Sequence, residues 1–392
     1  MRYTYIKNGN AVEQVRRILQ GSEDPSGPDA FIGDFIHAHA ADAILVLCRS
    51  TRRERLVGQS LVAESYPVAG GPLSWLRRWW AAIRVGVAIV RWRPRRVLCG
   101  CTAELLWISL LAAKLLRVPI VCSRHSGLAA RKGPGRLISA LDAASIRACD
   151  AVVCHGPFLA QQVRELGVAA EKIHQFDVDL RRFAELRPPP QPVELFEPGT
   201  LVVMYVGRIQ ANKGVLDLLE AFAACVREGH AVAGLVYIGT GKDEDALKAA
   251  VARNNLGAQV RLLGAVAHER LPALMRDACV IVAPTQPELV EGRCMVVLEA
   301  MALGVPVIAP DFAAFPYAIR HDVDGMLYTP GSVEALSASL ARMLSDPALR
   351  ARLRKGAGLS GQRLLVDPPR FAGAVEGAFA HACLFSHKIR QE

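Results

Sequence analysis

Residues 279–310, CVIVAPTQPELVEGRCMVVLEAMALGVPVIAP, decide the fold. They contain two short apolar runs, Cys279–Pro284 and Val305–Ala309, and runs rich in β-branched residues are typical of strands buried on both faces. Between them, Met295–Leu303 consists of helix formers and stops at Gly304, a frequent residue just past a helix. A strand, a loop, a helix and a second strand at this spacing predict a βαβ unit. The ligands of such units gather at the carboxyl ends of the strands.

Two acidic residues lie near the carboxyl end of the first of these strands. Glu291 falls in the predicted loop, and Glu299 falls in the first turns of the predicted helix. On one continuous helix the two would lie roughly 80° apart, so a loop at Glu291 is the better way to aim both side chains at one ligand. The alternative is that Glu291 is a solvated loop charge and Glu299 a favourable acid near a helix N-terminus.

A second strand-loop-helix segment lies upstream, at Leu201–Gly214, with the sequence LVVMYVGRIQANKG. It predicts a buried strand that ends at Gly207 and Arg208, and a helix that begins after Lys213. Free backbone N–H groups and the helix dipole favour an anion at a helix N-terminus, and the two cations add a forked donor and a point charge. This combination indicates a diphosphate site, although an arginine and a lysine in a loop can also be merely solvated. The loop lacks the GxxxxGK[ST] of a Walker loop, and no GxGxxG follows a predicted strand.

Three segments together resemble the nucleotide-binding half of the retaining glycosyltransferases of family four: Val206–Ala223, Tyr237–Gly241 and Val260–Pro310. The resemblance covers most of residues 199–350. It rests on the Gly-Arg…Lys-Gly loop, the Leu-Leu-Gly strand end, the two glutamates and GVPVIAP, which occur in the family's order and spacing. It implies the α/β GT-B fold, in which two Rossmann-like parallel-sheet domains face each other across a cleft.

The resemblance also implies roles for individual residues. Arg208 and Lys213 would hold the donor diphosphate, Glu299 would bind the ribose hydroxyls, and Glu291 would lie beside the donor sugar. The expected catalytic set is Arg208, Lys213, Glu291 and His125. The expected donor-binding set is Gly207, Gly241, Glu299, Arg293, Cys294, Met295 and Val296. The nucleotide sugar is a co-substrate, and we expect no cofactor and no metal, because the chain lacks a paired-aspartate metal motif.

The chain departs from the family pattern at two places. Residues 291–294 read Glu-Gly-Arg-Cys, whereas the family usually has Glu-Gly-Phe-Gly. Arg293 brings a positive charge to the sugar end of the site, where it could read an acidic sugar or an anionic acceptor, or else face solvent. Tyr317 stands where the family often has an acidic residue.

The N-terminal half predicts a second, less regular α/β domain. Its expected strands are Ala43–Cys48, Arg96–Gly100, Pro119–Cys122 and Asp150–Cys154, with a helix at Ala103–Leu116. In the resembled family a histidine after the third of these strands faces the donor sugar, and His125 is the candidate, whereas a lone histidine is more often a hydrogen-bonded structural residue. Residues 7–10, Lys-Asn-Gly-Asn, replace the glycine-rich acceptor loop of the family.

The positive charge of the chain is concentrated in its first half. Residues 1–190 contain 27 Lys and Arg against 16 Asp and Glu, whereas residues 191–392 contain 20 against 21. The segment Trp75–Arg96, WLRRWWAAIRVGVAIVRWRPRR, combines tryptophan with arginine, as interfacial amphipathic helices on anionic membranes do. The alternatives are a partly buried helix with solvated arginines and an RNA-binding stripe, but no RNA-binding motif accompanies it, and we expect no nucleic-acid partner. The expected membrane or acceptor surface consists of Trp75, Arg77, Arg78, Trp79, Trp80 and Arg84.

Length and proline content predict the domain organisation. A chain of 392 residues, 52% of them hydrophobic, suits two domains, and Arg187–Gly199 holds five prolines that disfavour a helix and stiffen a linker. We expect an acceptor-binding domain over 1–187, a linker over 188–198 and a nucleotide-sugar domain over 199–365. In the last of these we expect a helix over Gly331–Leu344, a break at Ser345-Asp346-Pro347 and a short charged helix. Residues 366–392 should hold a C-terminal helix, Phe371–Phe385, which in GT-B proteins often returns to the first domain.

These observations predict a retaining glycosyltransferase of the hexosyltransferase type that moves a sugar from a nucleoside diphosphate sugar to a hydroxyl of a lipid-linked or polysaccharide acceptor. We expect it in the cytoplasm, peripheral on the inner face of the membrane. No run of 18 residues is free of charge, and ten single cysteines suit a reducing compartment. The alternatives are a sugar-nucleotide epimerase or hydrolase on the same fold, and a catalytically silent nucleotide-sugar-binding protein.

Overall fold

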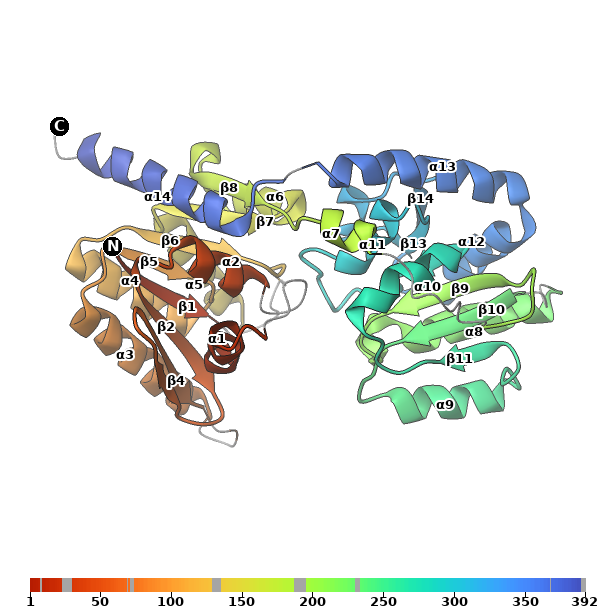
Figure 1. The fold of residues 1–392 in the computed structure, drawn as a ribbon, viewed down its shortest axis with the longest axis horizontal. Helices are drawn as coiled ribbons and strands as arrows, with labels where there is room; N and C mark the ends of the chain where they lie inside the picture. Colours follow the sequence, from red (N-terminus) through yellow and green to blue (C-terminus); the bar gives the residue numbers. More distant parts are fainter. Residues whose placement is uncertain are drawn as a thin grey trace. The chain divides into compact units, whose positions relative to one another are not determined.

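The computed structural model describes residues 1–7, 9–22, 30–68, 70, 74–128, 135–186, 195–229, 233–366 and 368–388. The chain divides into two compact units (Figure 1). The first comprises Met1–Val178 with Pro369–Glu392, and the second comprises Asp179–Pro368. Each unit holds its own mainly parallel sheet with helices on both faces, so the predicted α/β class and the pair of Rossmann-like domains are confirmed.

The sheet of the second unit is parallel throughout and has the order β11-β10-β9-β12-β13-β14. Its strands are β9 (Leu201–Val206), β10 (Ala233–Ile238), β11 (Val260–Leu262), β12 (Val280–Val282), β13 (Val307–Pro310) and β14 (Gly325–Tyr328). Successive strand residues point to opposite faces, and accordingly Tyr205 enters one core cluster and Met204 the other. The order runs one way from β9 and the other way from β12, so the topology switches between these two strands.

Helices cover both faces of this sheet. One face packs under α8 (Val215–Arg227), α9 (Glu244–Arg253) and α12 (Val333–Ser345). The other packs under α7 (Arg181–Glu185), α10 (Leu271–Asp277), α11 (Met295–Ala302) and the short η4 (Phe315–Tyr317). The remaining elements of the unit are η2 (Ala211–Lys213), η3 (His268–Arg270) and α13 (Pro347–Leu364).

Helix α13 is longer than predicted. The sequence analysis predicted a short charged helix after residues 345–347. Glycine lowers helix propensity by about 1 kcal/mol per residue. The structure has 18 residues of helix. A Cβ atom added at Gly356 would lie 1.8 Å from the carbonyl oxygen of Val323, and one at Gly361 would lie 2.0 Å from that of Met301. These glycines let α13 pack directly on the backbone of its neighbours, and this packing outweighs their low propensity.

The sheet of the first unit has the order β3-β4-β2-β1-β5-β6-β7-β8 and is parallel except for β3, which pairs antiparallel with β4. Its strands are β1 (Arg2–Lys7), β2 (Ala43–Ser50), β3 (Arg55–Val57), β4 (Leu61–Pro67), β5 (Arg96–Cys99), β6 (Ile120–Arg124), β7 (Ala151–His155) and β8 (Ile173–Phe176). The helices α3 (Ser74–Trp92), α4 (Glu104–Leu116), α5 (Gly135–Ala148) and α6 (Pro157–Glu165) pack on one face. On the other face lie α1 (Ala11–Leu19), α2 (Ala30–Ala38) and α14 (Phe371–Lys388), and η1 (Ala170–Lys172) precedes β8. The strands and the helix predicted for this half are confirmed to within two residues.

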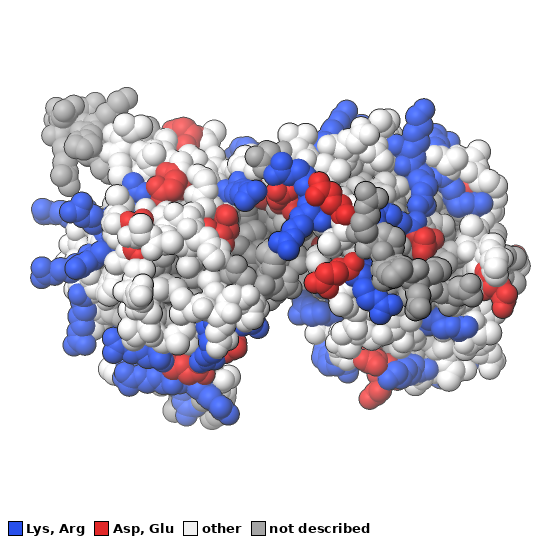
Figure 2. All heavy atoms as spheres, viewed as in Figure 1, with Lys and Arg blue, Asp and Glu red and all other residues white. Residues whose placement is uncertain are grey.

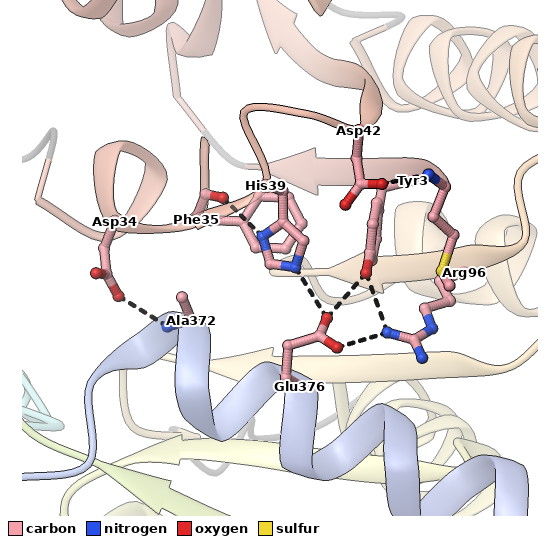
Figure 3. Close-up of polar contacts among 9 residues, drawn as sticks. Tyr3, Asp34, Phe35, His39, Asp42, Arg96, Ala372 and Glu376 are labelled. Atoms are coloured by element: carbon pink, nitrogen blue, oxygen red, sulfur yellow. Dashed lines mark hydrogen bonds and ion pairs between the residues drawn. The ribbon is translucent and has the colours of Figure 1, made fainter. Parts of the chain in front are cut away.

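The C-terminal helix α14 packs against β7, β8 and α2 of the first unit (Figure 1), which is the return expected for this segment. Glu376 lies at the centre of its polar contacts (Figure 3). The carboxylate accepts hydrogen bonds from the Tyr3 hydroxyl at 2.9 Å, from His39 Nε2 at 2.9 Å and from Arg96 Nη1 at 2.7 Å. The N–H of Ala372 donates to Asp34 at 2.8 Å. Helix α14 is thereby tied to strands and a helix from the beginning of the chain.

The boundary between the units lies at Val178, earlier than the linker predicted at 188–198. The reason is α7, which packs on α11 of the second unit. The Arg276 guanidinium also donates hydrogen bonds to the carbonyl oxygens of Ala184 and Leu186, the latter at 3.2 Å. Residues 187–194 of the proline-rich segment, and Asn8 of the segment that replaces the acceptor loop, lie outside the described residues.

Candidate active site

The candidate site lies at the carboxyl ends of β9 and β12, where the strand order of the second unit reverses. Open parallel sheets bind ligands at such a switch point. β9 ends at Val206 and leads into Gly207 and Arg208, and β12 ends at Val282 and leads through a loop to α11. The two segments that the sequence selected, 207–214 and 284–299, are therefore brought together by the topology.

Glycines allow the loops after β9, β10 and β12 to touch at backbone distance. A Cβ atom added at Gly214 would lie 1.8 Å from the carbonyl oxygen of Pro284, and one at Gly241 would lie 2.1 Å from that of Ile209. Gly214 also has a φ of 71°, a conformation that side chains disfavour. These contacts bring the loop that holds Arg208 and Lys213 within reach of the loop that holds Glu291.

Lys213 and Glu291 form the central contact of the site. Lys213 Nζ lies 2.5 Å from Glu291 Oε1, and both side chains are largely buried, with 18% and 13% of their surfaces exposed. The same carboxylate oxygen accepts a hydrogen bond from the Thr285 hydroxyl at 2.8 Å. The sequence analysis did not select Thr285, although a polar residue directly after the apolar run of β12 is a usable signal. Glu291 is thus held by both loops of the switch point.

Glu299 lies on α11. Burial raises the pKa of its carboxyl group to about 7. The carboxylate has no hydrogen-bond or ion-pair partner among the described residues. Burial also raises the pKa of the Cys294 thiol, and the charges of Glu291, Lys213 and Glu299 all act on this thiol. Cys294 therefore marks the place where the two loops and α11 converge.

The remaining donor-site candidates surround this centre. Arg208 is exposed, and its side chain makes no ion pair with any described residue. Arg293, Met295 and Val296 are half-buried in the loop before α11 and in its first turn. Tyr317, where the family often has an acid, lies in η4 with 46% of its surface exposed.

His125 belongs to the first unit, directly after β6. Its ring lies among aromatic side chains, with centroids 4.7 Å from Phe31, 5.5 Å from Phe176 and 5.3 Å from Phe371. Nε2 is 2.6 Å from the Ser123 hydroxyl, whereas the buried Nδ1 has no partner in the described part of the chain. Burial lowers the pKa of His125 well below its usual value, so the ring is neutral.

Helix α3 carries the tryptophan and arginine residues expected at a membrane. Its inner face, Ala81, Ala82, Val85, Gly86 and Ile89, is buried against the sheet. Its outer face exposes Trp75 and Trp80, at 59% and 62%, and also Leu76, Trp79, Ile83 and Val87. Helix α3 is therefore partly buried, and its outer face carries apolar side chains as well as arginines. Within the described ranges, no helix has the length and apolar character needed to cross a bilayer.

The neighbouring helix α4 also exposes apolar side chains. Leu111 and Leu115 are exposed by 66% and 71%, and the sequence analysis did not select them. Arg77 and Arg84 are exposed, but Arg78 also binds inward, because its Nε donates to the buried Glu104 at 2.8 Å. Arg78 is thus part of the packing between α3 and α4 as well as of the surface.

The chain matches two known protein families. Residues 191–358 match the family described as "Glycosyl transferases group 1", and residues 31–176 match "Glycosyltransferase Family 4". The two matches fall in the second and the first unit, respectively, and together they extend over most of the chain.

Curated relatives and solved structures agree with this match. A glycogen synthase of Mycobacterium tuberculosis is 27% identical over 266 residues, which are 65% of this chain and 61% of that protein. An α-D-kanosaminyltransferase of Streptomyces kanamyceticus is 27% identical over 267 residues, 63% of this chain and 67% of that protein.

The fold is similar to that of the Anabaena protein HepE, solved in complex with UDP and glucose, with a TM-score of 0.67. That similarity covers 99% of this chain and 100% of HepE at 17% sequence identity. The two family matches, the strand order and the loops at the switch point all agree. The chain belongs to the family-four glycosyltransferases with the GT-B fold.

Proposed function

We propose that the protein transfers a sugar from a nucleoside diphosphate sugar to an acceptor hydroxyl, with retention of the anomeric configuration. The observation that carries the proposal is the Lys213–Glu291 pair at the switch point, with Arg208 exposed at the other end of the same loop. It joins the two kinds of charge that a nucleotide sugar requires: cations for the diphosphate and carboxylates for hydroxyl groups.

The cations would stabilise the leaving group. As the bond between the sugar C1 and the diphosphate breaks, negative charge grows on the diphosphate and positive charge on the sugar ring. Gly214 caps α8 without a side-chain hydrogen bond, so the positive end of this helix adds to Arg208 and Lys213. A preorganised donor set of this kind can supply several kcal/mol of transition-state stabilisation.

Retention would follow from attack on the face that the leaving group occupies. In this step the acceptor oxygen forms a bond to C1, the C1–O bond to the diphosphate breaks, and the acceptor proton passes to a diphosphate oxygen. The protein supplies no nucleophile in this scheme. Glu291 would hold hydroxyl groups of the donor sugar, and Glu299 those of the ribose.

Metal independence is part of the proposal. Arg208 and Lys213 would neutralise the diphosphate directly, and the nucleotide sugar serves as co-substrate. We expect full activity in excess EDTA, and activity that returns only on addition of Mg²⁺ or Mn²⁺ would contradict this expectation.

The acceptor is proposed to be lipid-linked or the end of a polysaccharide, with the protein peripheral on the inner face of the cell membrane. The support is that α3 exposes tryptophans and arginines and that the neighbouring α4 exposes leucines. Figure 2 shows that lysine and arginine side chains gather along the margin of the first unit in this view. Apolar side chains among arginines suit an anionic bilayer surface.

A thermal-shift screen of nucleotide sugars tests the donor assignment. A ligand at 100 times its dissociation constant adds about 2.7 kcal/mol of stability, which is readily detected. UDP-glucose is the first compound to try, because HepE was solved with UDP and glucose. Absence of a shift with every UDP, GDP, ADP and dTDP sugar would contradict the proposal.

Product analysis separates this function from its two alternatives. An epimerase or hydrolase would convert the donor in the absence of any acceptor, whereas a transferase needs the acceptor for rapid turnover. A silent binding protein would give a thermal shift without turnover across a broad acceptor screen.

A further inference from the structure

Two side chains outside the loop between Arg208 and Lys213 hold that loop in place. The Tyr205 hydroxyl donates a hydrogen bond of 2.7 Å to the carbonyl oxygen of Arg208. Asp243 Oδ2 accepts one of 2.7 Å from the N–H of Ala211. We propose that Tyr205 and Asp243 are positioning residues, which fix the two cations for the diphosphate. The inference rests on the proposed function, because it deepens the assignment of the same site.

The loop needs such support because it has little structure of its own. Residues 208–210 have no regular secondary structure, and η2 is a single turn. Backbone bonds from neighbouring segments reach two of its residues. The carbonyl oxygen of Asn212 accepts from the N–H of Gln286 at 3.1 Å, and Ile209 donates to Thr240 at 3.0 Å and accepts from the N–H of Asp243 at 3.2 Å. The carbonyl group of Arg208 and the N–H of Ala211 lie to either side of this anchor. The side chains of Tyr205 and Asp243 add one hydrogen bond on each side of Ile209.

The position of Tyr205 favours its hydrogen bond to the Arg208 carbonyl oxygen. It points from β9 into the core with 3% of its surface exposed and packs on Tyr237 at a ring distance of 5.6 Å. A Cβ atom at Gly207 would lie 2.9 Å from the Tyr205 oxygen, so the hydroxyl reaches the Arg208 carbonyl beneath a glycine. Burial raises the pKa of Tyr205, and the phenol therefore keeps the proton that it donates.

Asp243 brackets the loop from the side of β10. Its carboxylate accepts from Ala211, while its own N–H donates to Ile209, so two successive bonds from one residue span the loop. Ala211 opens the turn that ends at Lys213. The direction of the lysine side chain thus depends on a residue of a different strand-helix connection.

Catalysis is sensitive to such support. Donors that are already aimed at the developing charge need no rearrangement at the moment of reaction, and a displacement of about 1 Å can cost on the order of 100-fold in rate. Removing either contact should leave the fold intact and let the cations move.

The test measures dissociation constants for inorganic pyrophosphate and for UDP by calorimetry, together with the thermal midpoint of each variant. Tyr66→Phe is the matched control for Tyr205→Phe. Tyr66 is a buried tyrosine of β4 in the first unit, and its hydroxyl donates a hydrogen bond of 2.9 Å to Glu64. Asp245→Ala, an exposed change two residues further on, is the control for Asp243→Ala.

We expect Tyr205→Phe and Asp243→Ala to weaken pyrophosphate binding about fivefold to tenfold, since each loses one well-formed hydrogen bond. Asp243→Asn keeps an acceptor oxygen for Ala211 and should stay within about twofold of the wild type. Both control variants should bind like the wild type. Turnover of UDP-glucose should follow the same order, with kcat reduced more than KM is raised.

The outcomes distinguish a failure of the two positioning roles from a failure of the diphosphate site. If Lys213→Ala loses pyrophosphate binding while Tyr205→Phe and Asp243→Ala match their controls, the positioning roles are overturned and the diphosphate site stands. If the wild type binds neither probe, or Lys213→Ala binds like the wild type, the diphosphate site falls and the positioning roles fall with it.

Discussion

Lys213 Nζ lies 2.5 Å from Glu291 Oε1, although 78 residues separate the two in the chain. This contact joins the loop after β9 to the loop before α11 across the switch point of the sheet. It keeps a cation and an acid side by side in a largely buried place, where charge-assisted hydrogen bonds are strong. A donor diphosphate would share Lys213 with the carboxylate.

The first prediction concerns the two cations. Arg208→Ala and Lys213→Ala should each lower kcat/KM at least about tenfold, a loss of roughly 1.4 kcal/mol of transition-state stabilisation. Lys213→Ala should be the more severe, since it also leaves the buried Glu291 without its cation. Steady-state kinetics measure the effect, with Lys248→Ala on the exposed face of α9 as the control. Wild-type rates in either variant would remove the diphosphate assignment.

The second prediction concerns Glu299. Its pKa of about 7 exceeds that of an unfolded glutamate, so the folded protein holds an extra proton between pH 4.5 and 7. The free energy of unfolding of the unliganded protein should therefore fall as the pH rises through this window, and Glu299→Gln should remove that fall. Donor affinity should change in the opposite sense, because only the charged carboxylate is a full acceptor for ribose hydroxyls. Thermal midpoints at pH 5, 7 and 8 test the trend in stability, and UDP affinities at the same pH values test the trend in donor binding. Identical pH profiles in Glu299→Gln and the wild type would contradict the role proposed for Glu299.

The third prediction concerns the contacts of α14. The hydrogen bond from His39, followed by those from Arg96 and Tyr3, lowers the pKa of Glu376 to about 2. Burial opposes charge on His39, but its bonds to Glu376 and to the Phe35 carbonyl outweigh burial and raise its pKa. The contribution of Glu376 is present above pH 4.5 and is lost as the pH falls towards 2. That of His39 is present below pH 6.5 and is lost as the pH rises through its raised pKa.

Glu376→Gln should therefore speed hydrogen exchange of the α14 amides about fivefold at pH 6, which corresponds to about 1 kcal/mol, a modest value because Glu376 is half exposed. Exchange resolved by mass spectrometry measures this, with Glu171→Gln as an exposed control in the same unit. Unchanged protection of α14 would show that the apolar contacts alone hold it.

Much of the fold could be predicted because the hydrophobic periodicity of a buried strand or an amphipathic helix is visible within a short segment of the sequence. The run that ends at Gly207, the helix after Lys213 and the C-terminal helix from Phe371 all match the structure closely. Helix α3 ends at Trp92 rather than running on, because Arg93 adopts a φ of 50° before Pro94 and the next strand begins at Arg96.

What local pattern cannot reveal is contact between distant segments. The edge strand β3 and its neighbour β4 were missed, since they owe their conformation to pairing with each other and with β2. Asp243 holds a loop that follows another strand, so the residues around Asp243 in the sequence do not indicate its partner. Leu111 and Leu115 become part of a surface only when α4 lies beside α3.

The fourth prediction concerns that surface. The protein should sediment with anionic vesicles, and binding should weaken with salt, because the screening length falls from about 10 Å at 0.1 M to about 3 Å at 1 M. Trp80→Glu and Leu111→Glu should each reduce binding, since both side chains are mostly exposed on the outer faces of α3 and α4. Leu359→Glu, on α13 of the second unit, is the matched control at 55% exposure. Equal binding to neutral vesicles, or equal loss in the control, would argue against the membrane surface.

The last prediction concerns the glycines of α13, which explain why this helix exceeds the length expected from its composition. A Cβ atom at Gly361 would lie 2.0 Å from the Met301 carbonyl oxygen, whereas at Gly358 nothing lies within 4 Å. Gly361→Ala should therefore destabilise the second unit by about 1–3 kcal/mol, because backbone must move apart. Gly358→Ala, in the same helix, should instead stabilise it by about 0.5–1 kcal/mol, because alanine loses less conformational freedom on folding. Denaturant midpoints of the two variants should move in opposite directions, and a shift in the same direction would mean that close contact with the α11 backbone does not decide the length of α13.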